Sequence, residues 1–469
     1  MAQQTQRISP RVLGAVLATG LMSFCGVIVE TAMNITFPTL MREFHVNTAS
    51  VQWMTTIYLL TVAIMVPLSA ILKKRFRTKT LFLVANLLFI IGLVLDTFAG
   101  QFPILLLGRV VQGLGTGIAL PLMFNIILEQ VPMAKIGFMM GIGTLITAIA
   151  PAIGPTFGGI VVSTLGWRYI FVFLLPILVF SLIIGSRCIE QKNTLQRVSF
   201  DGFSLVLIVA TFGGLIIGFS NMGSQPLTSL LVGGAFIVGL VGLIGLVIRS
   251  LRLATPVINL KLLRNGDFAG HTLGFFLMQL TALGLSFILP NYIQLVNQNS
   301  ATIAGLVVLP GALLGAIFAP FSGRILDSLG PKKPLLLGSS LATLSLLLFS
   351  WLGRGLSDSL IVALYLLFMA GVGLAYGNIM TNGLKLLTVE QQADGNAIFT
   401  TIQQFAGAMG TAIVAAIIGQ SQNGALKTTV ATAIGSQHAF YFLLVLLVIE
   451  LVVLGKVILW PRQLDKSAK

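Results

Sequence analysis

Long apolar stretches follow one another along the whole chain, and only short polar segments separate them. A helix needs about 20 mostly apolar residues to cross the ~30 Å hydrocarbon core of a bilayer. Stretches of about this length occur near residues 12–36, 51–72, 80–99, 103–128, 137–162, 169–187, 202–220, 229–248, 270–292, 303–323, 334–352, 360–383, 397–419 and 438–460. They are continuous rather than alternating, which excludes a spanning β-barrel. The pattern predicts an all-α membrane protein with about 14 transmembrane helices.

The segments between these stretches are too short to form extramembrane domains. The longest, 188–201, 249–268 and 420–437, have only about 14 to 20 residues. Charged residues make up 9% of the chain, whereas a soluble domain has roughly 25%. Any binding site should therefore be built within the membrane.

The net charge of +15 comes from cations in the short gaps, not from a basic cluster with aromatic residues, which argues against a nucleic-acid partner. With the N-terminus inside, 23 of the 28 Lys and Arg lie on the cytoplasmic side and four (Arg42, Arg168, Arg354 and Lys427) lie outside. This division follows the positive-inside rule. The remaining cation, Arg109, stands within a helix. We predict a multi-pass protein of the cell (plasma) membrane with both termini cytoplasmic.

Two related loop sequences indicate an internal repeat. Residues 323–333 (GRILDSLGPKK) follow the tenth stretch, and a degenerate relative at 69–79 (SAILKKRFRTK) follows the second. The first six and last six helices then correspond, and repeated halves around a midplane site are typical of secondary transporters. We expect a six-helix bundle in 1–190, an inserted helix pair in 191–265 and a second six-helix bundle in 266–469.

The fourth stretch carries the segment Arg109-Val-Val-Gln112-Gly113-Leu-Gly115. An arginine in a membrane helix is costly unless it faces a wet cavity or a partner. Arg109 therefore either meets a partner or a cavity within the bundle, or it snorkels from the outer leaflet to the interface.

The fifth stretch contains Gly154-Pro155-Thr-Phe-Gly158-Gly159. Small residues at this spacing let two helices approach closely, and the proline removes a backbone amide and permits a bend. The alternative is ordinary helix packing with no part in transport.

The first stretch holds a carboxyl group, Glu30, followed by Asn34 and Pro38 at intervals of one turn. Apolar residues occupy most of the two turns before Glu30, and such desolvation favours proton uptake near neutral pH. Glu30 is thus a candidate for proton coupling or cation binding, with Asn34 on the same face. The alternative is a structural partner for a neighbouring helix.

These three segments resemble motifs of the major facilitator superfamily, in particular its fourteen-helix drug:proton antiporter branch. The resemblance covers nearly the whole chain and is strengthened by residues 304–311 and 403–411. It implies two six-helix bundles that alternate access to a central site. It also implies a proton-coupling role for Arg109 and for Glu30, which stands where the branch usually has Asp. Residues 154–159 then correspond to the family's antiporter motif, which is typical of export.

The loop repeat matches the family in one copy only. The second copy keeps the family's residues at Gly323, Asp327 and Gly330. In the first copy, Lys73 stands where the family has an acidic residue and Phe76 where it has a glycine. We interpret the basic residues of that first loop as topology anchors.

Other polar residues within the stretches could hydrogen-bond a ligand or one another. They are Gln112, Gln279, Asn291, Gln294, Asn378, Asn382, Gln403 and Gln404. Glu450, midway along the last stretch, could be structural, contact a lipid headgroup or take part in transport. The 31 Phe and 15 Met could form an adaptable apolar binding surface.

The favoured hypothesis is a proton-driven exporter of lipophilic or cationic drugs and toxic compounds. A dedicated exporter of one metabolite, antibiotic or lipid is the alternative, and a membrane enzyme or sensor is remote because no polar catalytic cluster is evident. No G-x-x-x-x-G-K-[ST] loop or H-E-x-x-H metal site is present. We therefore expect no metal and no cofactor, and a proton gradient as the driving force. The expected partners are protons, a small-molecule substrate and membrane lipids. We expect the protein to function as a monomer.

Overall fold

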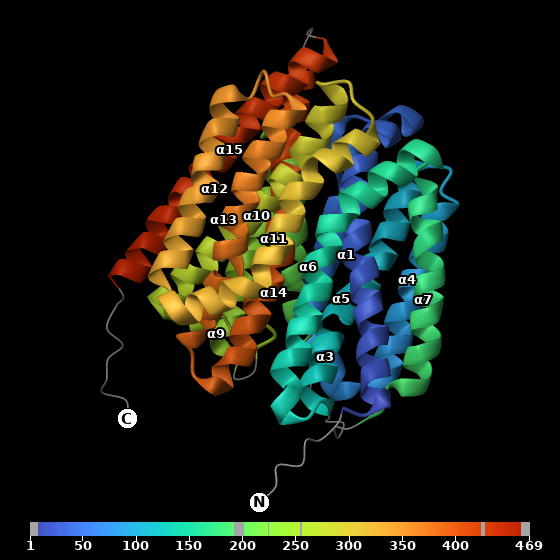
Figure 1. The fold of residues 1–469 in the computed structure, drawn as a ribbon, viewed down its shortest axis with the longest axis vertical. Coiled ribbons are helices and arrows are strands. Elements are labelled where there is room, and N and C mark those ends of the chain that lie inside the picture. The colour runs from blue at the N-terminus through green and yellow to red at the C-terminus, as the bar shows by residue number, and fades with distance from the viewer. Residues whose placement is uncertain (1–7, 192–200, 224, 254–255, 424–426, 461–469) are drawn as a thin grey trace, which may run out of the picture.

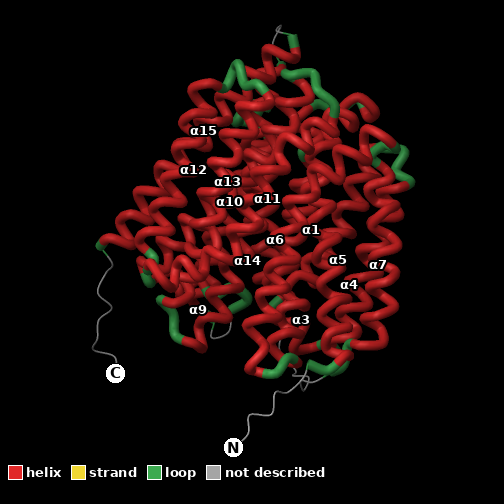
Figure 2. The backbone as a smooth tube through the Cα atoms, viewed as in Figure 1, coloured by secondary structure: helices red, strands yellow, loops and turns green. Residues whose placement is uncertain are grey.

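The computed structural model describes residues 8–191, 201–223, 225–253, 256–423 and 427–460. Within its helices, side chains are not described at residues 70, 133–134, 136–138, 141, 144–145, 148, 319–320, 322–324, 326–328 and 389. Every regular element in the described ranges is a helix, as Figure 2 shows. The prediction of an all-α protein is confirmed.

Fourteen long helices occur in the described ranges, and each coincides with one predicted stretch. They are α1 (Pro10–Phe44), α3 (Trp53–Arg75), α4 (Thr78–Thr97), α5 (Phe102–Gln130), α6 (Met133–Thr164), α7 (Arg168–Cys188), α8 (Gly202–Asn221), α9 (Ala235–Arg252), α10 (Gly266–Leu295), α11 (Ala301–Leu329), α12 (Lys332–Leu352), α13 (Asp358–Lys385), α14 (Val389–Gln422) and α15 (Thr428–Leu459). Three short helices precede α3, α9 and α10, namely α2 (Thr48–Val51), η1 (Leu230–Gly234) and η2 (Leu260–Arg264).

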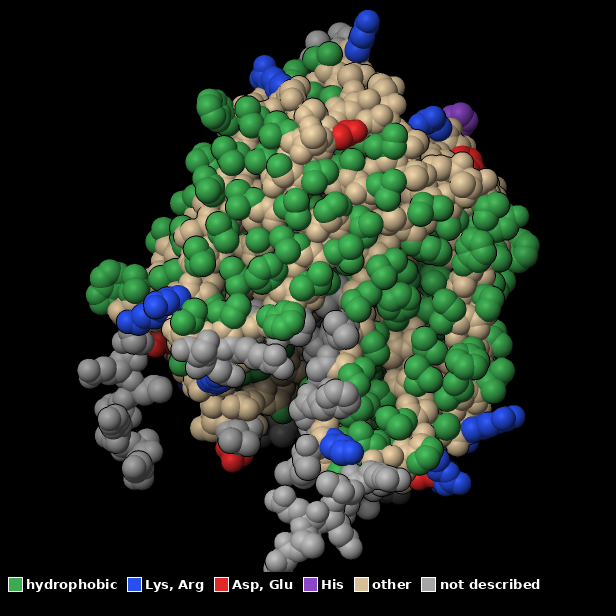
Figure 3. Space-filling view, in the orientation of Figure 1, with side chains coloured by type: hydrophobic (Ala, Val, Ile, Leu, Met, Phe, Trp, Pro, Cys, Tyr) green, Lys and Arg blue, Asp and Glu red, His purple; other side chains and the backbone are tan. Residues whose placement is uncertain are grey.

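The helices have the length and composition that a bilayer requires. Thirteen of those described are long and apolar enough to cross a membrane. The described apolar part of α6 is the shorter stretch Ile149–Thr164, although the whole helix has 32 residues. Hydrophobic side chains cover the middle of the surface in Figure 3, and most charged side chains lie toward its two ends. The predicted count of about 14 spans agrees with this arrangement.

Several helices extend beyond the apolar windows. α1 begins at Pro10, where the Ser9 hydroxyl accepts a hydrogen bond from the Val12 amide (3.3 Å). It ends at Phe44, where His45 takes a left-handed conformation (φ 53°). The predicted end near residue 36 is too early, because hydropathy detects the hydrocarbon core and not the polar turns that continue a helix past it.

The helices before and after the inserted pair form two groups. In the first, α1 packs against α5, α6 and α7, α3 packs against α5, and α4 packs against α5 and α7. In the second, α10 packs against α13, α14 and α15, while α11 and α12 pack against α13. The groups lie side by side in Figure 1, blue to teal on the right and yellow to red on the left. An even number of spans places Pro10 and Leu459 at one face, here called the terminal face.

Contacts between the groups are made by α6 with α11, α3 with α14 and α1 with α10. At the first of these, the Thr302 hydroxyl donates to the Gly159 carbonyl (3.1 Å) and the Thr156 hydroxyl donates to the Gly305 carbonyl (3.0 Å). These bonds join the end of α6 to the start of α11. They therefore lie toward the face opposite the termini.

The inserted pair packs at the edge of both groups. α9 contacts mainly α8, which in turn contacts α14 and α3. Gly214 and Gly239 bring the two helices so close that a Cβ atom on either would meet the other backbone. At the opposite face the Gln52 side-chain amide donates to the Ser220 hydroxyl (3.0 Å), which ties α8 to the first group.

Candidate functional site: a charged network in the first helix group

Arg109 of α5 is fully buried. Its Nε donates to the Met54 carbonyl (2.9 Å), and its Nη1 donates to the Gln112 side-chain carbonyl (2.6 Å). The guanidinium also lies over the Tyr58 ring, 4.3 Å from the centroid, in a cation–π contact that a dry site strengthens. The snorkelling alternative is wrong for this conformation, because the whole side chain is covered by protein.

A buried carboxylate completes the network. The Gln112 amide nitrogen donates to Asp96 Oδ2 (2.7 Å), so Gln112 links Asp96 of α4 to Arg109. Asp96 is also fully buried. The close approach of Asp96 to α5 requires glycine at position 108, since a Cβ there would collide with the Asp96 carboxylate. Sequence reasoning missed Asp96; the available signal was an acidic residue at the end of an apolar stretch, which is rare unless it is functional.

Two atoms of this network lack hydrogen-bond partners in the described part of the chain. Arg109 Nη2 and Asp96 Oδ1 are both buried, and neither has a hydrogen-bond partner among the described residues. Buried polar atoms without partners are costly.

Glu30 of α1 lies within electrostatic reach of Arg109 and Tyr58. Its side chain is half-buried rather than buried. No hydrogen bond or ion pair of Glu30 is found among the described side chains. The structure thus brings together the two residues predicted to couple protons, with one buried and the other partly accessible.

The second helix group reaches this carboxylate as well. Tyr376 of α13 lies near both Glu30 and Gln403 of α14. Its ring stacks on Phe275 of α10, with centroids 4.3 Å apart. Tyr376 and Gln403 are half-buried, like Glu30. Glu30 therefore interacts electrostatically with Tyr376 of the second group, and Tyr376 is a further residue that sequence reasoning did not single out.

Two of the predicted asparagines form hydrogen bonds to neighbouring helices. Asn34 is buried, accepting from the Thr55 hydroxyl (2.9 Å) and donating to the Ser286 hydroxyl (3.4 Å). It therefore links α1 to α3 and α10, and its expected role beside Glu30 stays a prediction. The Asn382 amide bonds to His271 Nε2 (2.8 Å) on α10.

Three more candidates bond to backbone carbonyls. Asn291 donates to Phe287 within its own helix (2.7 Å) and Asn378 likewise to Leu374 (2.8 Å), whereas Gln294 donates to Ile35 of α1 (3.0 Å). Gln279 and Gln404 are half-buried. The hydrogen bonds named here do not reach Glu30.

The glycine motif of α6 contacts both groups. A Cβ at Gly158 would lie 2.6 Å from the Ala32 carbonyl of α1, and one at Gly159 would collide with the Ala301 backbone of α11. Gly154 faces Thr31 of α1 in the same way. Pro155 lies within the helix, and its carbonyl would meet a Cβ at Gly305. The motif therefore lies where the two groups meet.

Gly113 of α5 also permits a close approach. A Cβ at this position would lie 2.7 Å from Thr61 and 3.0 Å from the Tyr58 carbonyl of α3. It therefore belongs to packing within the first group, next to the Arg109 network.

The loop motifs are described in part. Lys73 forms an ion pair with Glu129 of α5, so it has a specific partner besides any role as a topology anchor. Gly330 ends α11 with φ 70°, a conformation that favours glycine. The side chains of residues 323 and 327 lie outside the described part of the chain, so Gly323 and Asp327 remain predictions.

Glu450 of α15 is fully buried, and its Oε1 accepts a hydrogen bond from the Ser339 hydroxyl of α12 (2.8 Å). Its Oε2 has no partner among the described residues. The lipid-headgroup interpretation is wrong for this conformation, because the carboxyl group faces α12 and not the surface.

Comparisons with known proteins identify the family to which this fold belongs. The family model described as "Major Facilitator Superfamily" matches residues 19–411. "Lincomycin resistance protein LmrB" of Bacillus subtilis is 37% identical over 96% of both chains. "Multidrug resistance protein B homolog" of Mycobacterium tuberculosis is 26% identical over 87% of this chain and 76% of its own.

Solved structures share the fold at low identity. A bacterial homolog to the human lysosomal transporter Spinster aligns with a TM-score of 0.69 at 15% identity, covering 95% of this chain and 96% of its own. A D-xylose-proton symporter aligns with a TM-score of 0.66 at 14% identity over the same shares. The chain belongs to the major facilitator superfamily and is a multi-pass membrane transport protein, not an enzyme.

Proposed function

We propose that the protein exports lipophilic or cationic drugs and toxic compounds in exchange for protons, by alternating access. The observation that carries the proposal is the half-buried Glu30 beside the buried Arg109–Gln112–Asp96 network. Resistance to lincomycin and to multiple drugs, named for two relatives, supports drugs as the substrate class.

Charge balance explains how Glu30 can exchange a proton for a substrate. When Glu30 is ionised, its negative charge is attracted to Arg109 and can attract a cationic substrate. When Glu30 is protonated, that attraction is lost, and the neutral group fits an apolar environment better. Proton binding and substrate binding then favour different states of one site, which is the differential affinity that coupling requires.

The apolar part of the substrate is bound by aromatic side chains. Tyr376 and Phe275 form a stacked pair beside Glu30, and Gln403 offers an adaptable amide. Such surfaces recognise many apolar shapes because they rely on contact area and little on directional bonds. This composition favours a broad substrate range.

The conformational change is a rocking of residues 1–190 against 266–469, with 191–265 as the inserted pair. The terminal face is cytoplasmic in this proposal, because the short loops there carry most of the cations. The monomer acts in the plasma membrane with the proton gradient as its only driving force, and no metal or cofactor takes part.

A compound panel tests the substrate class. Cells lacking their own pumps and expressing the protein should exclude lincomycin and a lipophilic cation such as ethidium, and an ionophore that collapses the proton gradient should abolish the exclusion. Exclusion of lincomycin alone would favour the dedicated exporter, which the name of the Bacillus relative also suggests. Exclusion that survives the ionophore would contradict proton exchange.

A further inference from the structure

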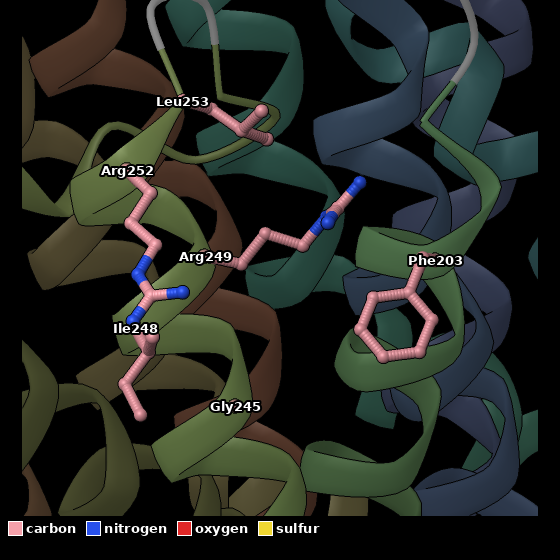
Figure 4. A pocket seen from close by; sticks show the side chains of 6 residues that line it. All are labelled: Phe203, Gly245, Ile248, Arg249, Arg252 and Leu253. Carbon is pink, nitrogen blue, oxygen red and sulfur yellow. The ribbon is translucent and has the colours of Figure 1, made fainter.

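A small hollow opens between the two inserted helices near the terminal face (Figure 4). Its volume is about 250 Å³, whereas sites for drug-sized ligands have roughly 300–1,000 Å³. The hollow is therefore too small for a whole drug. Its walls are formed by Phe203, Gly245, Ile248, Arg249, Arg252 and Leu253.

One of the two arginines in this wall is already neutralised. Arg249 donates two hydrogen bonds to the Asp201 carboxylate, Nε to Oδ2 (2.9 Å) and Nη2 to Oδ1 (2.7 Å). Its guanidinium also lies over the Phe203 ring, 5.1 Å from the centroid. This arginine holds the pKa of Asp201 well below its usual range, so the carboxyl group stays ionised at neutral pH. The pair fixes the start of α8 to the last turn of α9 and contributes no net charge.

Arg252 is the uncompensated cation of the hollow. Its side chain is exposed, and no hydrogen bond or ion pair of Arg252 is found among the described residues. In Figure 4 it extends along α9 beside Ile248, while Arg249 reaches across toward Phe203. Lys261 adds a second cation at the rim, where its amine donates to the Leu253 carbonyl (2.8 Å).

The surface next to these cations is apolar. Phe203 is 58% exposed, and Val241, Ile244 and Ile248 on α9 are 62%, 53% and 46% exposed. α9 packs chiefly on α8, so these side chains face the lipid of a bilayer. A cation at the membrane boundary above an apolar helix surface is complementary to one ligand class, a phosphate diester joined to acyl chains.

We propose that this hollow binds the headgroup of an anionic phospholipid, with its phosphate on Arg252 and an acyl chain along the exposed surface of α8 and α9. The lipid holds the inserted pair at the terminal face, where Asp201 and Arg249 already clamp it. At the opposite face, the bond between Gln52 and Ser220 holds α8. The site is separate from the transport pathway and does not depend on the proposed substrate.

Lipid retention by the purified full-length protein tests the proposal. In native mass spectrometry the parent should retain phosphatidylglycerol in preference to phosphatidylcholine. Arg252→Gln should weaken phosphatidylglycerol binding about fivefold, which corresponds to about 1 kcal/mol for one cation near the surface. Asp201→Asn should strengthen it by a similar factor, because it leaves Arg249 without its counter-ion.

Arg187→Gln is the matched control. Arg187 lies in the last turn of α7, at the same face but outside the hollow, so this variant loses the same charge and should bind phosphatidylglycerol like the parent. Unchanged binding by Arg252→Gln, or an equal loss in Arg187→Gln, would overturn the proposal. So would displacement of the lipid by inorganic phosphate at equal concentration, since the hollow would then recognise only the anion. Equal melting temperatures of the lipid-free variants exclude misfolding as the cause.

Discussion

Arg109 and Asp96 are opposite charges enclosed in the same helix group, and Gln112 stands between them. Removing both charges from water carries a large desolvation penalty, which their attraction and hydrogen bonds offset only in part. Arg109 Nη2 and Asp96 Oδ1 have no hydrogen-bond partner among the described residues, so the offset is incomplete at these two atoms. Removing either charge would leave the other buried without its counter-charge.

The first prediction concerns this pair. Asp96→Asn keeps an acceptor for Gln112 but leaves Arg109 without its buried counter-charge. Breaking a buried pair in this way typically destabilises a protein by about 3 kcal/mol. We expect a lower melting temperature and at least a tenfold loss of uphill efflux. Asp394→Asn, at an exposed carboxylate of α14, should change neither quantity. A variant at position 96 with parental stability and efflux would contradict the role of the network.

The second prediction separates Glu450 from the coupling residues. Glu450→Gln preserves shape and the bond to Ser339 without an ionisable group, so proton-driven efflux should remain within about twofold of the parent. Ser339→Ala should lower stability by about 1 kcal/mol, because it removes the one hydrogen bond that Glu450 Oε1 accepts in the described structure. Loss of efflux in a stable Glu450→Gln protein would instead make this carboxyl group a second proton site.

The sequence predicts which single residues carry the chemistry better than it predicts which residues they contact. An intramembrane charge must be satisfied, so Arg109 and Glu30 could be identified without a structure. Asp96 and Tyr376 could not be paired with them, because a helical sequence does not state which face meets which neighbour. Asn34 shows the same limit: its spacing from Glu30 is correct, but its bonds go to Thr55 and Ser286.

At the scale of helices, the glycine motif of α6 sets how closely the two groups approach. Gly158 lies against the backbone of α1, and Gly159 lies against the start of α11. Without side chains at these positions, α6 can pack closely against both helices. A helix that contacts both groups must slide or separate when access alternates.

The third prediction tests this contact. Gly158→Leu should impair efflux at least tenfold while leaving expression and membrane insertion intact, because a leucine would force α6 away from Ala32. Gly213→Leu is the control, since a Cβ at Gly213 of α8 meets no atom within 4 Å. Comparable efflux from both variants would reduce the motif to ordinary packing.

Element positions follow from hydropathy, whereas element ends do not. Each of the fourteen apolar stretches corresponds to one helix. The helices run past the stretches because capping residues such as Ser9 and Ser300 set their ends. Capping is a local hydrogen bond that an apolar window does not detect.

At the scale of the whole molecule, the described bonds between α6 and α11 lie toward the face opposite the termini. The loop repeat predicted two corresponding halves from sequence, but which helices meet between them is a property of packing. Residues far apart in sequence, such as Thr156 and Gly305, are neighbours only in the folded chain.

The fourth prediction concerns orientation in the membrane. With Cys25 and Cys188 replaced, single cysteines at positions 75 and 332 should react with membrane-impermeant reagents only from the cytoplasmic side. Cysteines at 45 and 299 should react from outside, because an odd number of spans separates them from the terminal face. Labelling of 75 and 332 from opposite sides would contradict the arrangement of spans.

We propose that Glu30 couples substrate export to proton entry. Uphill transport of a lipophilic cation into proteoliposomes under an imposed pH gradient measures this step directly. Glu30→Gln should abolish uphill transport while apolar ligands still bind, since aromatic and aliphatic contacts remain. Glu30→Asp keeps an ionisable group and should retain measurable coupled transport. If Glu30→Gln instead accumulates the cation as well as the parent does under the same gradient, Glu30 is structural and the account of coupling is contradicted.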